Sequence, residues 1–412
     1  MTLQALLGIA VLTALAWAIS ENRRAIRPGV VIAGLGLQLA IALLLLKLPG
    51  AQAVFHGLND ALLALQEATR AGTSFVFGYL GGGDLPFDPK SPGGAFVLAF
   101  QVLPLILVMS ALSALLFHWR ILPAIVRGFA WLLERSMHVR GPLGLGTAAN
   151  VFMGMVESPL LVRPYLATMS RADLFALMTA GMATIAGTML ALYASVLGNV
   201  IDNAVGHILT ASLISAPAAL MFARLLVPAD SNESHEAARI DLPYRSSMDA
   251  LTYGTVEGLK LLAHIVAMLI VLVAVVALAN QMLGLIQIGD EALSLQRLLG
   301  WLLAPLAWLL GIPWGEAHIA GGLLGTKTVL NEMLAYLELA ALPPDALSAH
   351  SRLILTYALC GFANFGSLGI LIGGMGAMAP ERRAEIVALG PKCILSGTLA
   401  TCLTGAVAGL IV

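Results

Sequence analysis

The sequence predicts an all-α polytopic membrane protein with eight transmembrane helices, two re-entrant helical hairpins in an inverted repeat, and interfacial helices. Composition is the first reason, because 59% of the 412 residues are hydrophobic and 11% are charged, whereas soluble domains have about 25% charged residues. The second is the presence of eight apolar runs of about 20 residues, the length that crosses a bilayer as a helix. The third is a pair of stretches, 141–166 and 311–336, in which glycines, prolines and ionisable residues interrupt the apolar pattern.

The eight apolar runs are the predicted spans. They cover residues 2–20, 29–48, 94–117, 172–198, 205–227, 249–284, 351–378 and 386–412. Two connecting segments, within 49–93 and at 119–138, mix polar and apolar residues, and each is expected to hold an amphipathic helix in the membrane interface. Lys and Arg residues follow the first, third and fifth spans and precede the eighth. This distribution predicts that those loops are cytoplasmic and that both termini lie outside.

Hairpin, broken helix and helix follow one another twice along the chain. The span after 141–166 is interrupted at TIAGT (184–188), and the span after 311–336 is interrupted at CGFANFGSLG (360–369). The predicted orientation puts the two hairpins on opposite sides, and such an inverted repeat indicates a transporter with its binding site near the membrane midplane. We expect the following division: scaffold helices in 1–140, a first transport repeat in 141–227, a cytoplasmic linker in 228–248, a long scaffold span in 249–296 and a second transport repeat in 297–412.

Several function classes lack support in the sequence. A net charge of −1 gives no basic field for binding nucleic acid. The chain has neither a phosphate-binding loop for ATP nor the H-E-x-x-H pattern of a zinc protease. Its three cysteines, Cys360, Cys393 and Cys402, show no metal-ligand spacing and are predicted to be core residues. We expect no enzymatic activity, and a membrane enzyme acting on a nucleoside or lipid is the alternative from a different class.

Glu157 is the candidate binding carboxylate of the first hairpin. An ionisable group at the bilayer centre costs about 2.5–3.5 kcal/mol, so such groups face protein, water or a ligand. Glu157 directly precedes Ser158 and Pro159, which are predicted to mark the hairpin tip. A structural ion pair with Arg163 is the alternative role for this carboxylate.

Glu332 is the corresponding candidate in the second hairpin. It follows Asn331, and Lys327 lies one helical turn before Asn331. A structural ion pair between Lys327 and Glu332 is the alternative to a ligand-binding role. Glu316 and His318, nearer the start of the hairpin, are expected to be packing or lip residues.

The interruptions of the two broken spans supply further polar candidates. Asn364 and Ser367 are three residues apart, so on a helix they face the same way, and the nearby glycines permit unwinding. Asn150 and Thr184 offer hard oxygen ligands, which suit an alkali cation better than a transition metal. For both pairs, hydrogen bonding between helices is the alternative role.

Three stretches resemble motifs of a known family, the concentrative nucleoside transporters, in the eight-span form found in bacteria. GTKTVLNEMLAY (325–336) is similar to the family pattern G-x-K-x-x-x-N-E-F-V-A-Y, MGMVESPLLVRPYL (153–166) resembles its first-hairpin motif, and ALCGFANFGSLGI (358–370) resembles its seventh-helix motif. The resemblance implies a homotrimer, and the expected location is the bacterial inner membrane. There the Lys and Arg distribution would place both termini in the periplasm. The resemblance further implies that the protein imports nucleosides together with a cation.

The resemblance also implies roles for particular residues. The ribose hydroxyls would be held by Glu332, Asn364 and Ser367. The base would pack on Phe362 and Met189, with Glu157 helping to bind it. The sodium ion would be held by Asn150 and Thr184 together with the backbone carbonyls of Met153 and Ile185.

One departure from the family pattern bears on selectivity. Met155 and Val156 stand where the family often has Gln-Thr, and their side chains cannot hydrogen-bond a base edge. We therefore expect a more apolar base pocket with broad or purine-tolerant selectivity. Sodium is the expected coupling ion, and a proton that titrates Glu157 or Glu332 is the alternative.

Overall fold

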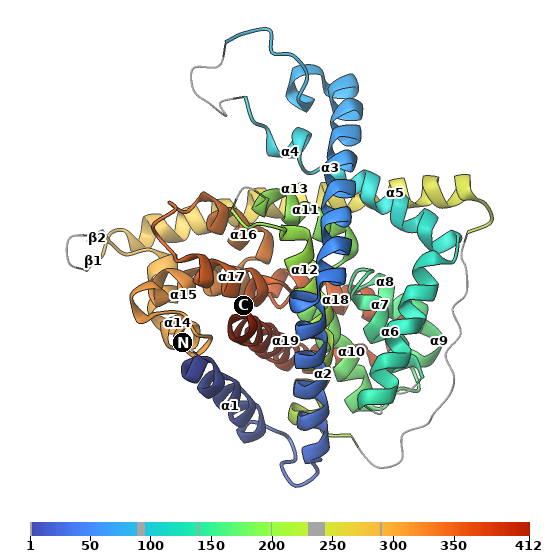
Figure 1. Ribbon diagram of the computed structural model, residues 1–412, viewed down its shortest axis with the longest axis vertical. Helices are drawn as coiled ribbons and strands as arrows, with labels where there is room; N and C mark the ends of the chain where they lie inside the picture. Colours follow the sequence, from blue (N-terminus) through green and yellow to red (C-terminus); the bar gives the residue numbers. More distant parts are fainter. Residues whose placement is uncertain are drawn as a thin grey trace.

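The structure, a computed structural model, describes residues 2–88, 95–137, 139, 141–198, 200–229, 244–288 and 291–412. The described residues are almost entirely helical (Figure 1). Two short strands, β1 (Gln287–Ile288) and β2 (Glu291–Ala292), form an antiparallel pair. The fold is therefore the predicted all-α membrane fold, and in the part of the chain that the structure describes no sheet contributes to the core.

The N-terminal part contains the first three predicted spans. The elements are α1 (Thr2–Ala18), α2 (Pro28–Lys47), α3 (Pro49–Phe77), η1 (Gly78–Gly81), α4 (Leu98–Gln101) and α5 (Leu105–His118). Prolines at the first turns of α2 and α3 start these helices without losing an internal hydrogen bond. In Figure 1 the far end of α3 projects beyond the body with η1, so the predicted amphipathic segment is a single long helix. Its position in the membrane interface stays a prediction.

The two repeats contain the same series of elements. Helix α6 (Ile121–Met137) precedes the first, which comprises α7 (Pro142–Asn150), α8 (Glu157–Leu161), α9 (Arg163–Leu166), α10 (Arg171–Ala183), α11 (Gly187–Leu197) and α12 (Ala204–Leu226). After the long helix α13 (Ser247–Leu283), the second comprises α14 (Leu295–Leu309), α15 (Trp314–Val329), α16 (Glu332–Ala341), α17 (Ala349–Leu359), α18 (Phe365–Met378), η2 (Pro380–Arg382) and α19 (Arg383–Ile411). Each repeat thus contains a hairpin, a broken span and a final helix, and one further helix, α6 or α14, directly precedes each hairpin.

The predicted spans correspond to helices of the structure. Among the described residues, six helical segments are long and apolar enough to cross a membrane: α2, α4–α5, α10–α11, α12, α13 and η2–α19. The first span is α1, with 17 residues, and the seventh is divided into α17 and α18. Helices α14 and α15 meet at a bend of 116°, as in a broken span or a re-entrant loop. The described residues do not include Arg140 or residues 230–243 of the predicted linker, the range that contains Arg239.

The structure corrects three details of the sequence prediction. The first hairpin turns at residues 151–156, so Ser158 and Pro159 lie inside α8. Proline is tolerated there because the first-turn amides have no partner within the helix. Helix α14 was not predicted as a separate element. The glycines at 321 and 325 do not interrupt α15, because they let it approach α14: a Cβ at Gly321 would lie 2.7 Å from the Gly300 carbonyl oxygen.

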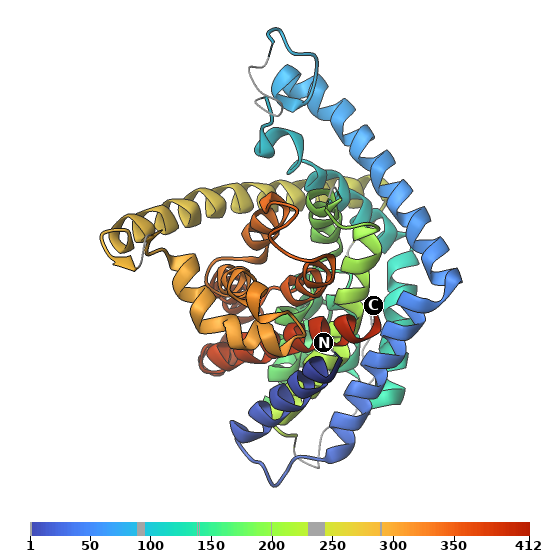
Figure 2. The same ribbon diagram turned by 60° about the vertical axis from the view of Figure 1, so that its left-hand side comes forward.

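The core lies around α12 and α19. These helices are 83% and 72% buried over their most apolar windows, whereas α13, the most apolar candidate span, is only 6% buried. Helix α2 packs on α12, α1 packs on α19, and α5 packs on α13. Helix α13 runs as one rod across the body (Figure 2). Its exposed apolar side chains therefore require lipid or another protein surface. The division into scaffold and transport parts stays a prediction.

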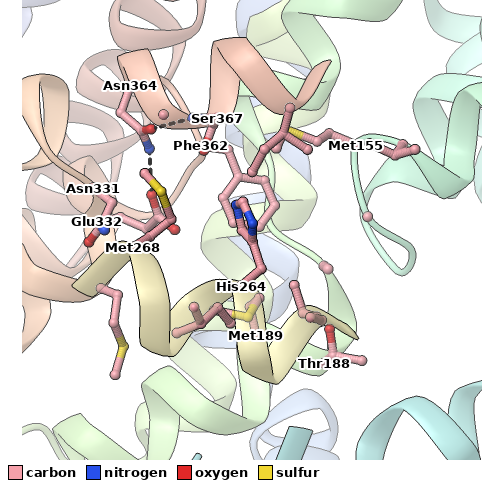
Figure 3. Close-up of a pocket in the computed structure, with 18 of the residues that line it drawn as sticks. Met155, Thr188, Met189, His264, Met268, Asn331, Glu332, Phe362, Asn364 and Ser367 are labelled. Atoms are coloured by element: carbon pink, nitrogen blue, oxygen red, sulfur yellow. Dashed lines mark hydrogen bonds between the residues drawn. The ribbon is translucent and has the colours of Figure 1, made fainter. Parts of the chain in front are cut away.

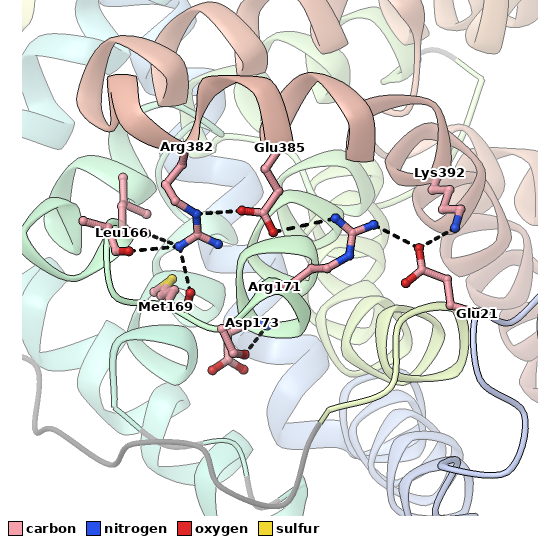
Figure 4. A network of polar contacts seen from close by, with 10 residues as sticks. Glu21, Leu166, Met169, Arg171, Asp173, Arg382, Glu385 and Lys392 are labelled. Atoms are coloured by element: carbon pink, nitrogen blue, oxygen red, sulfur yellow. Dashed lines mark hydrogen bonds and ion pairs between the residues drawn. The ribbon is translucent and has the colours of Figure 1, made fainter.

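A network of ion pairs ties the first repeat to the rest of the molecule (Figure 4). Arg171, at the start of α10, contacts Glu21 at 3.1 Å and Glu385 at 3.7 Å. Lys392 of α19 also contacts Glu21, at 2.5 Å. Partial burial favours the neutral form of Glu21, but hydrogen bonds from Lys392 and Arg171 outweigh it and lower the pKa of this carboxyl.

Arg382 extends this network to the end of the first hairpin. Its Nη1 donates to the carbonyl oxygens of Leu166, Ala167 and Met169 at 3.2, 3.0 and 2.8 Å. Its Nε donates to Glu385 at 2.6 Å. The guanidinium therefore caps the backbone where the hairpin leads into α10.

Candidate functional site

The interruptions of the two broken spans meet inside the molecule. Gly361 has φ +155°, and a Cβ there would lie 2.8 Å from the Ala183 carbonyl oxygen at the end of α10. Gly397 of α19 lies against both spans, because its Cβ would come within 2.7 Å of Met182 and 3.1 Å of Ala363. Glycine is required at these positions because a side chain would push the two breaks apart. Half-helix ends and unwound backbone from both repeats are thus brought together.

A pocket lies beside these breaks (Figure 3). Its walls come from the tips of both hairpins, the starts of α11 and α18, and one face of α13. All eight residues predicted to bind substrate line it: Met155, Val156, Glu157, Met189, Glu332, Phe362, Asn364 and Ser367. The packing therefore brings into one cavity side chains that are spread over more than two hundred positions of sequence.

Glu332 is the centre of the polar side of the pocket. It is the first residue of α16 and is 4% exposed. Tyr193 donates its hydroxyl to Glu332 Oε1 at 2.5 Å, and Asn364 donates Nδ2 to Oε2 at 2.8 Å. Asn364 in turn accepts the backbone N–H of Ser367 at 2.7 Å, which caps α18. The carboxylate is therefore fixed in position and keeps lone pairs for further donors.

The tip of the second hairpin is shaped by a similar cap. Asn331 precedes α16, and its Oδ1 accepts from the backbone N–H of Leu334 at 2.8 Å. Tyr336, one turn further along α16, donates to the Thr356 carbonyl at 2.8 Å, and its ring lies 5.0 Å from the ring of Tyr193. These contacts hold the first turn of α16 against α17 and α11, so the orientation of Glu332 depends on both repeats.

The opposite side of the pocket is apolar. Figure 3 shows Phe362, Met189 and Met155 together, away from Asn364 and Glu332. Met155 packs against α10, where a Cβ at Gly181 would lie 3.1 Å from the Met155 Cβ. Val156 packs against α18 in the same way, 2.9 Å from a Cβ at Gly374. This arrangement gives the pocket one hydrogen-bonding end and one apolar end.

Glu157 lines the pocket but does not reach the polar end. It begins α8, and its carboxylate folds back over the hairpin turn, where a Cβ at Gly154 would overlap it. Ser158 secures the turn by donating its hydroxyl to the Gly146 carbonyl of α7. Arg163 begins α9 and is exposed. No Glu157–Arg163 ion pair occurs among the described residues, which disfavours the structural alternative.

Lys327 is separate from the pocket. Its Nζ donates to the Ala358 carbonyl at 3.2 Å and to the Thr401 hydroxyl at 2.6 Å. No direct ion pair between Lys327 and Glu332 occurs among the described residues, and each group is hydrogen-bonded to other partners. Glu316 accepts from the backbone N–H and hydroxyl of Ser348 at 3.2 and 3.0 Å, and His318 packs on Trp314. Both lie outside the pocket lining.

The predicted sodium ligands also lie together, near the interruption of the fourth span. Thr184 Oγ1 donates to the Asn150 carbonyl at 3.3 Å and to the Ala180 carbonyl at 2.9 Å. Asn150 is 1% exposed, and neither atom of its side-chain amide has a hydrogen-bond partner. Ile185 is fully buried beside Thr184, and Met153 lies at the hairpin turn. A buried amide without partners is costly, and a cation coordinated by its oxygen would remove part of that cost.

Sequence reasoning missed the contribution of α13. Residues at helical spacing on one face line the pocket: Leu261, His264, Ile265, Met268, Leu269 and Leu272. His264 lies close to Phe362 and Met189 in Figure 3. An ionisable residue inside an apolar span is itself a signal of a functional site, so His264 could have been found. The face of α13 that meets the pocket could not be predicted from the sequence.

Comparisons with known proteins match the whole chain to one family. Models described as the N-terminal and C-terminal parts of the Na+ dependent nucleoside transporter match residues 7–80 and 207–409, and a model described as "Gate: Nucleoside recognition" matches 99–200. The nucleoside permease NupC of Helicobacter pylori is 35% identical over 100% of this chain and 98% of that protein. The chain belongs to the Na+ dependent nucleoside transporter family.

Further members of the nucleoside transporter family support the assignment. Sodium/nucleoside cotransporter 1 of Rattus norvegicus is 33% identical over 98% of this chain and 63% of that protein. The structure of CNTnw in an inward-facing substrate-bound state superposes with a TM-score of 0.91 at 36% identity, covering 99% of this chain and 98% of that chain. The chain is therefore an integral membrane protein of a transporter family and not an enzyme, as the sequence indicated.

Proposed function

We propose that this protein imports nucleosides across the bacterial inner membrane by symport with sodium. The observation that carries the sodium assignment is the buried side-chain amide of Asn150, which has no hydrogen-bond partner, in a residue whose backbone carbonyl accepts the hydroxyl of Thr184. Two oxygens from these side chains, with the backbone carbonyls of Met153 and Ile185, make a set of hard ligands that suits an alkali cation.

The two ends of the pocket match the two parts of a nucleoside. Glu332 can accept hydrogen bonds from ribose hydroxyls, while Asn364 and Ser367 offer further polar groups in a site with little water. Phe362 and Met189 provide an apolar surface for the face of the base. Met155, Val156 and Glu157 adjoin that surface from the first hairpin. Since Met155 and Val156 have no hydrogen-bonding groups, the base site favours broad or purine-tolerant recognition.

Sodium coupling would supply the driving force for accumulation. An uncharged nucleoside gains nothing from the membrane potential, whereas one co-transported monovalent cation adds about 2.3 kcal/mol per 100 mV, or about 50-fold accumulation. The cation site and the substrate pocket share the first hairpin, because Asn150 ends α7 and Glu157 begins α8. A sodium ion bound at the cation site can therefore stabilise the conformation of the first hairpin that the substrate pocket requires.

The proposal includes alternating access, with the two hairpins moving relative to a scaffold that contains α13. Both termini are expected in the periplasm. The sparsely buried, apolar α13 supports a contact surface between subunits, and the family resemblance supports a homotrimer.

Uptake by proteoliposomes tests the proposal. Labelled uridine and adenosine should accumulate when sodium is high outside, and Asn150→Ala should require a higher sodium concentration for half-maximal uptake. Accumulation driven by a pH gradient without sodium would instead favour proton coupling, for which Glu157 and Glu332 are the candidate groups. Recovery of the nucleoside chemically unchanged from the vesicles separates transport from an enzymatic reaction. Sodium-independent uptake by the wild type would contradict the role of Asn150 and Thr184.

A further inference from the structure

Lys327 is a fully buried lysine in the last turn of α15. Its two hydrogen bonds go to neutral oxygens, the carbonyl of Ala358 and the hydroxyl of Thr401. A buried ammonium is costly unless its surroundings compensate the charge. The Ala358 carbonyl belongs to the last turn of α17, where the helix dipole favours a cation. The end of α17 is thus a favourable place for the positive charge of an ammonium at the interruption of the broken span.

The first repeat has its proposed cation site at the corresponding interruption. Asn150 ends α7, the first helix of the hairpin, and Thr184 follows the last turn of α10. The final helix of the repeat also reaches this place, because the hydroxyl of Ser212 in α12 accepts the backbone N–H of Ile185 at 3.4 Å. Three elements therefore meet here: the first hairpin helix, the end of the first half of the broken span, and the final helix.

The same three elements meet around Lys327. It lies in the first hairpin helix of the second repeat, Ala358 lies at the end of the first half of the broken span, and Thr401 lies on the final helix. We propose that the Lys327 ammonium is a tethered cation that occupies, in the second repeat, the position equivalent to the sodium site of the first. This inference rests on the proposed function, because it takes the Asn150 site as the sodium site.

The chemistry of the two sites is compatible with this equivalence. Carbonyl and hydroxyl oxygens at a half-helix end are ligands for sodium, and an ammonium group donates its hydrogens to the same kinds of oxygen. A covalently attached cation holds the hairpin against α17 and α19 permanently, whereas a dissociable ion does so only when bound. Lys327 is thus a positioning residue. The second hairpin is fixed without a dissociable ion, and transport needs a single sodium ion, which binds at the first hairpin.

The test of this inference measures how uridine binding to the purified full-length protein in detergent depends on sodium. Lys327→Ala empties the position, and Lys327→Met removes the charge but fills the space of the stem. In Lys327→Ala, uridine binding should weaken at sodium concentrations that saturate the wild type and return on adding more sodium chloride or ammonium chloride. The Hill coefficient for sodium should rise from about 1 to about 2, because a second ion would be required. Lys327→Met should not be rescued.

Other outcomes would overturn the inference. They are wild-type sodium dependence in Lys327→Ala, a loss of binding that neither cation restores, or full binding by Lys327→Met. If Lys327→Ala does not fold, charge movement by wild-type proteoliposomes decides, with about one elementary charge per nucleoside expected; two charges would contradict a resident cation. Sodium-independent binding by the wild type would overturn the proposed function as well, whereas sodium-dependent wild-type binding with unaltered variants would overturn the Lys327 inference alone.

Discussion

Replacing Glu332 by glutamine tests whether this carboxylate binds the ribose. Its two oxygens accept from the Tyr193 hydroxyl at 2.5 Å and from Asn364 Nδ2 at 2.8 Å. Glutamine keeps the shape of the side chain but exchanges one acceptor for an N–H₂ group. That group must then face the hydroxyl or the amide that now donates, so the variant loses both a charge and an acceptor.

The expected loss follows from the strength of the bonds involved. Hydrogen bonds to a charged group contribute about 1.5–3 kcal/mol, and neutral ones about half as much. Losing one charge-assisted bond to a ribose hydroxyl should cost about 2–3 kcal/mol, which is a decrease of about 30- to 150-fold in uridine affinity. Tyr193→Phe is the matched control, because it removes a neutral donor from the same carboxylate and leaves the charge. It should cost about 1 kcal/mol, or about 5-fold.

Equilibrium binding of uridine and 3′-deoxyuridine to purified protein in sodium measures these effects. The wild type should prefer uridine, and Glu332→Gln should reduce that preference, with thermal unfolding confirming that the variant is folded. Unchanged uridine affinity in a folded Glu332→Gln protein would refute a ribose-binding role. An equal loss for both nucleosides would refute a bond to the 3′-hydroxyl, because the carboxylate would then act away from the deleted group.

Three further predictions concern other parts of the chain. Met155→Gln combined with Val156→Thr should shift competitive uptake toward uridine, because these side chains can hydrogen-bond a base edge; an equal change for adenosine and uridine would count against it. His264→Leu should weaken adenosine binding by about 1 kcal/mol, or about 5-fold, if its ring bonds the base. Purine riboside, which lacks the exocyclic amine, is the control ligand, and equal losses for both would indicate a packing role. Glu21→Gln should lower the free energy of unfolding by about 0.5 kcal/mol near neutral pH, a small effect because the pairs with Arg171 and Lys392 are partly exposed. Folding lowers the pKa of Glu21, so the stability difference between wild type and variant should be present above the ordinary pKa of 4.5 and vanish as the pH falls below the lowered pKa. Thermal unfolding over that pH range checks this expectation. A stability difference that persists in acid would contradict the ion-pair explanation.

Much of the site could be predicted from local sequence. The eight pocket residues lie in three short motifs and one position of α11, and all of them line the cavity. The tip of the first hairpin was misplaced because Ser158 and Pro159 are common both in turns and in first helical turns. Helix α14 was missed because its boundary with α15 depends on a bend at Gly311, where φ is +106°, and neighbouring apolar residues give no signal of that bend.

The partners of the buried charges could not be predicted. Lys327 and Glu332 are close in sequence and of opposite charge, which suggested an ion pair. In the folded protein the ammonium faces α17 and α19, while the carboxylate faces Tyr193 of the first repeat. Sequence spacing describes neighbours on one helix, but these two residues lie on opposite sides of the hairpin turn.

The sequence by itself determined that this chain spans a membrane, that it contains two related halves, and which motifs carry polar groups into the apolar region. These properties depend on the cost of burying local charge and backbone, which is set residue by residue. Only the tertiary structure decided that His264 faces the pocket, that Tyr193 supports Glu332, and that Lys327 lies at the second interruption. Each of these contacts joins residues from different helices, and its distance depends on how the helices pack.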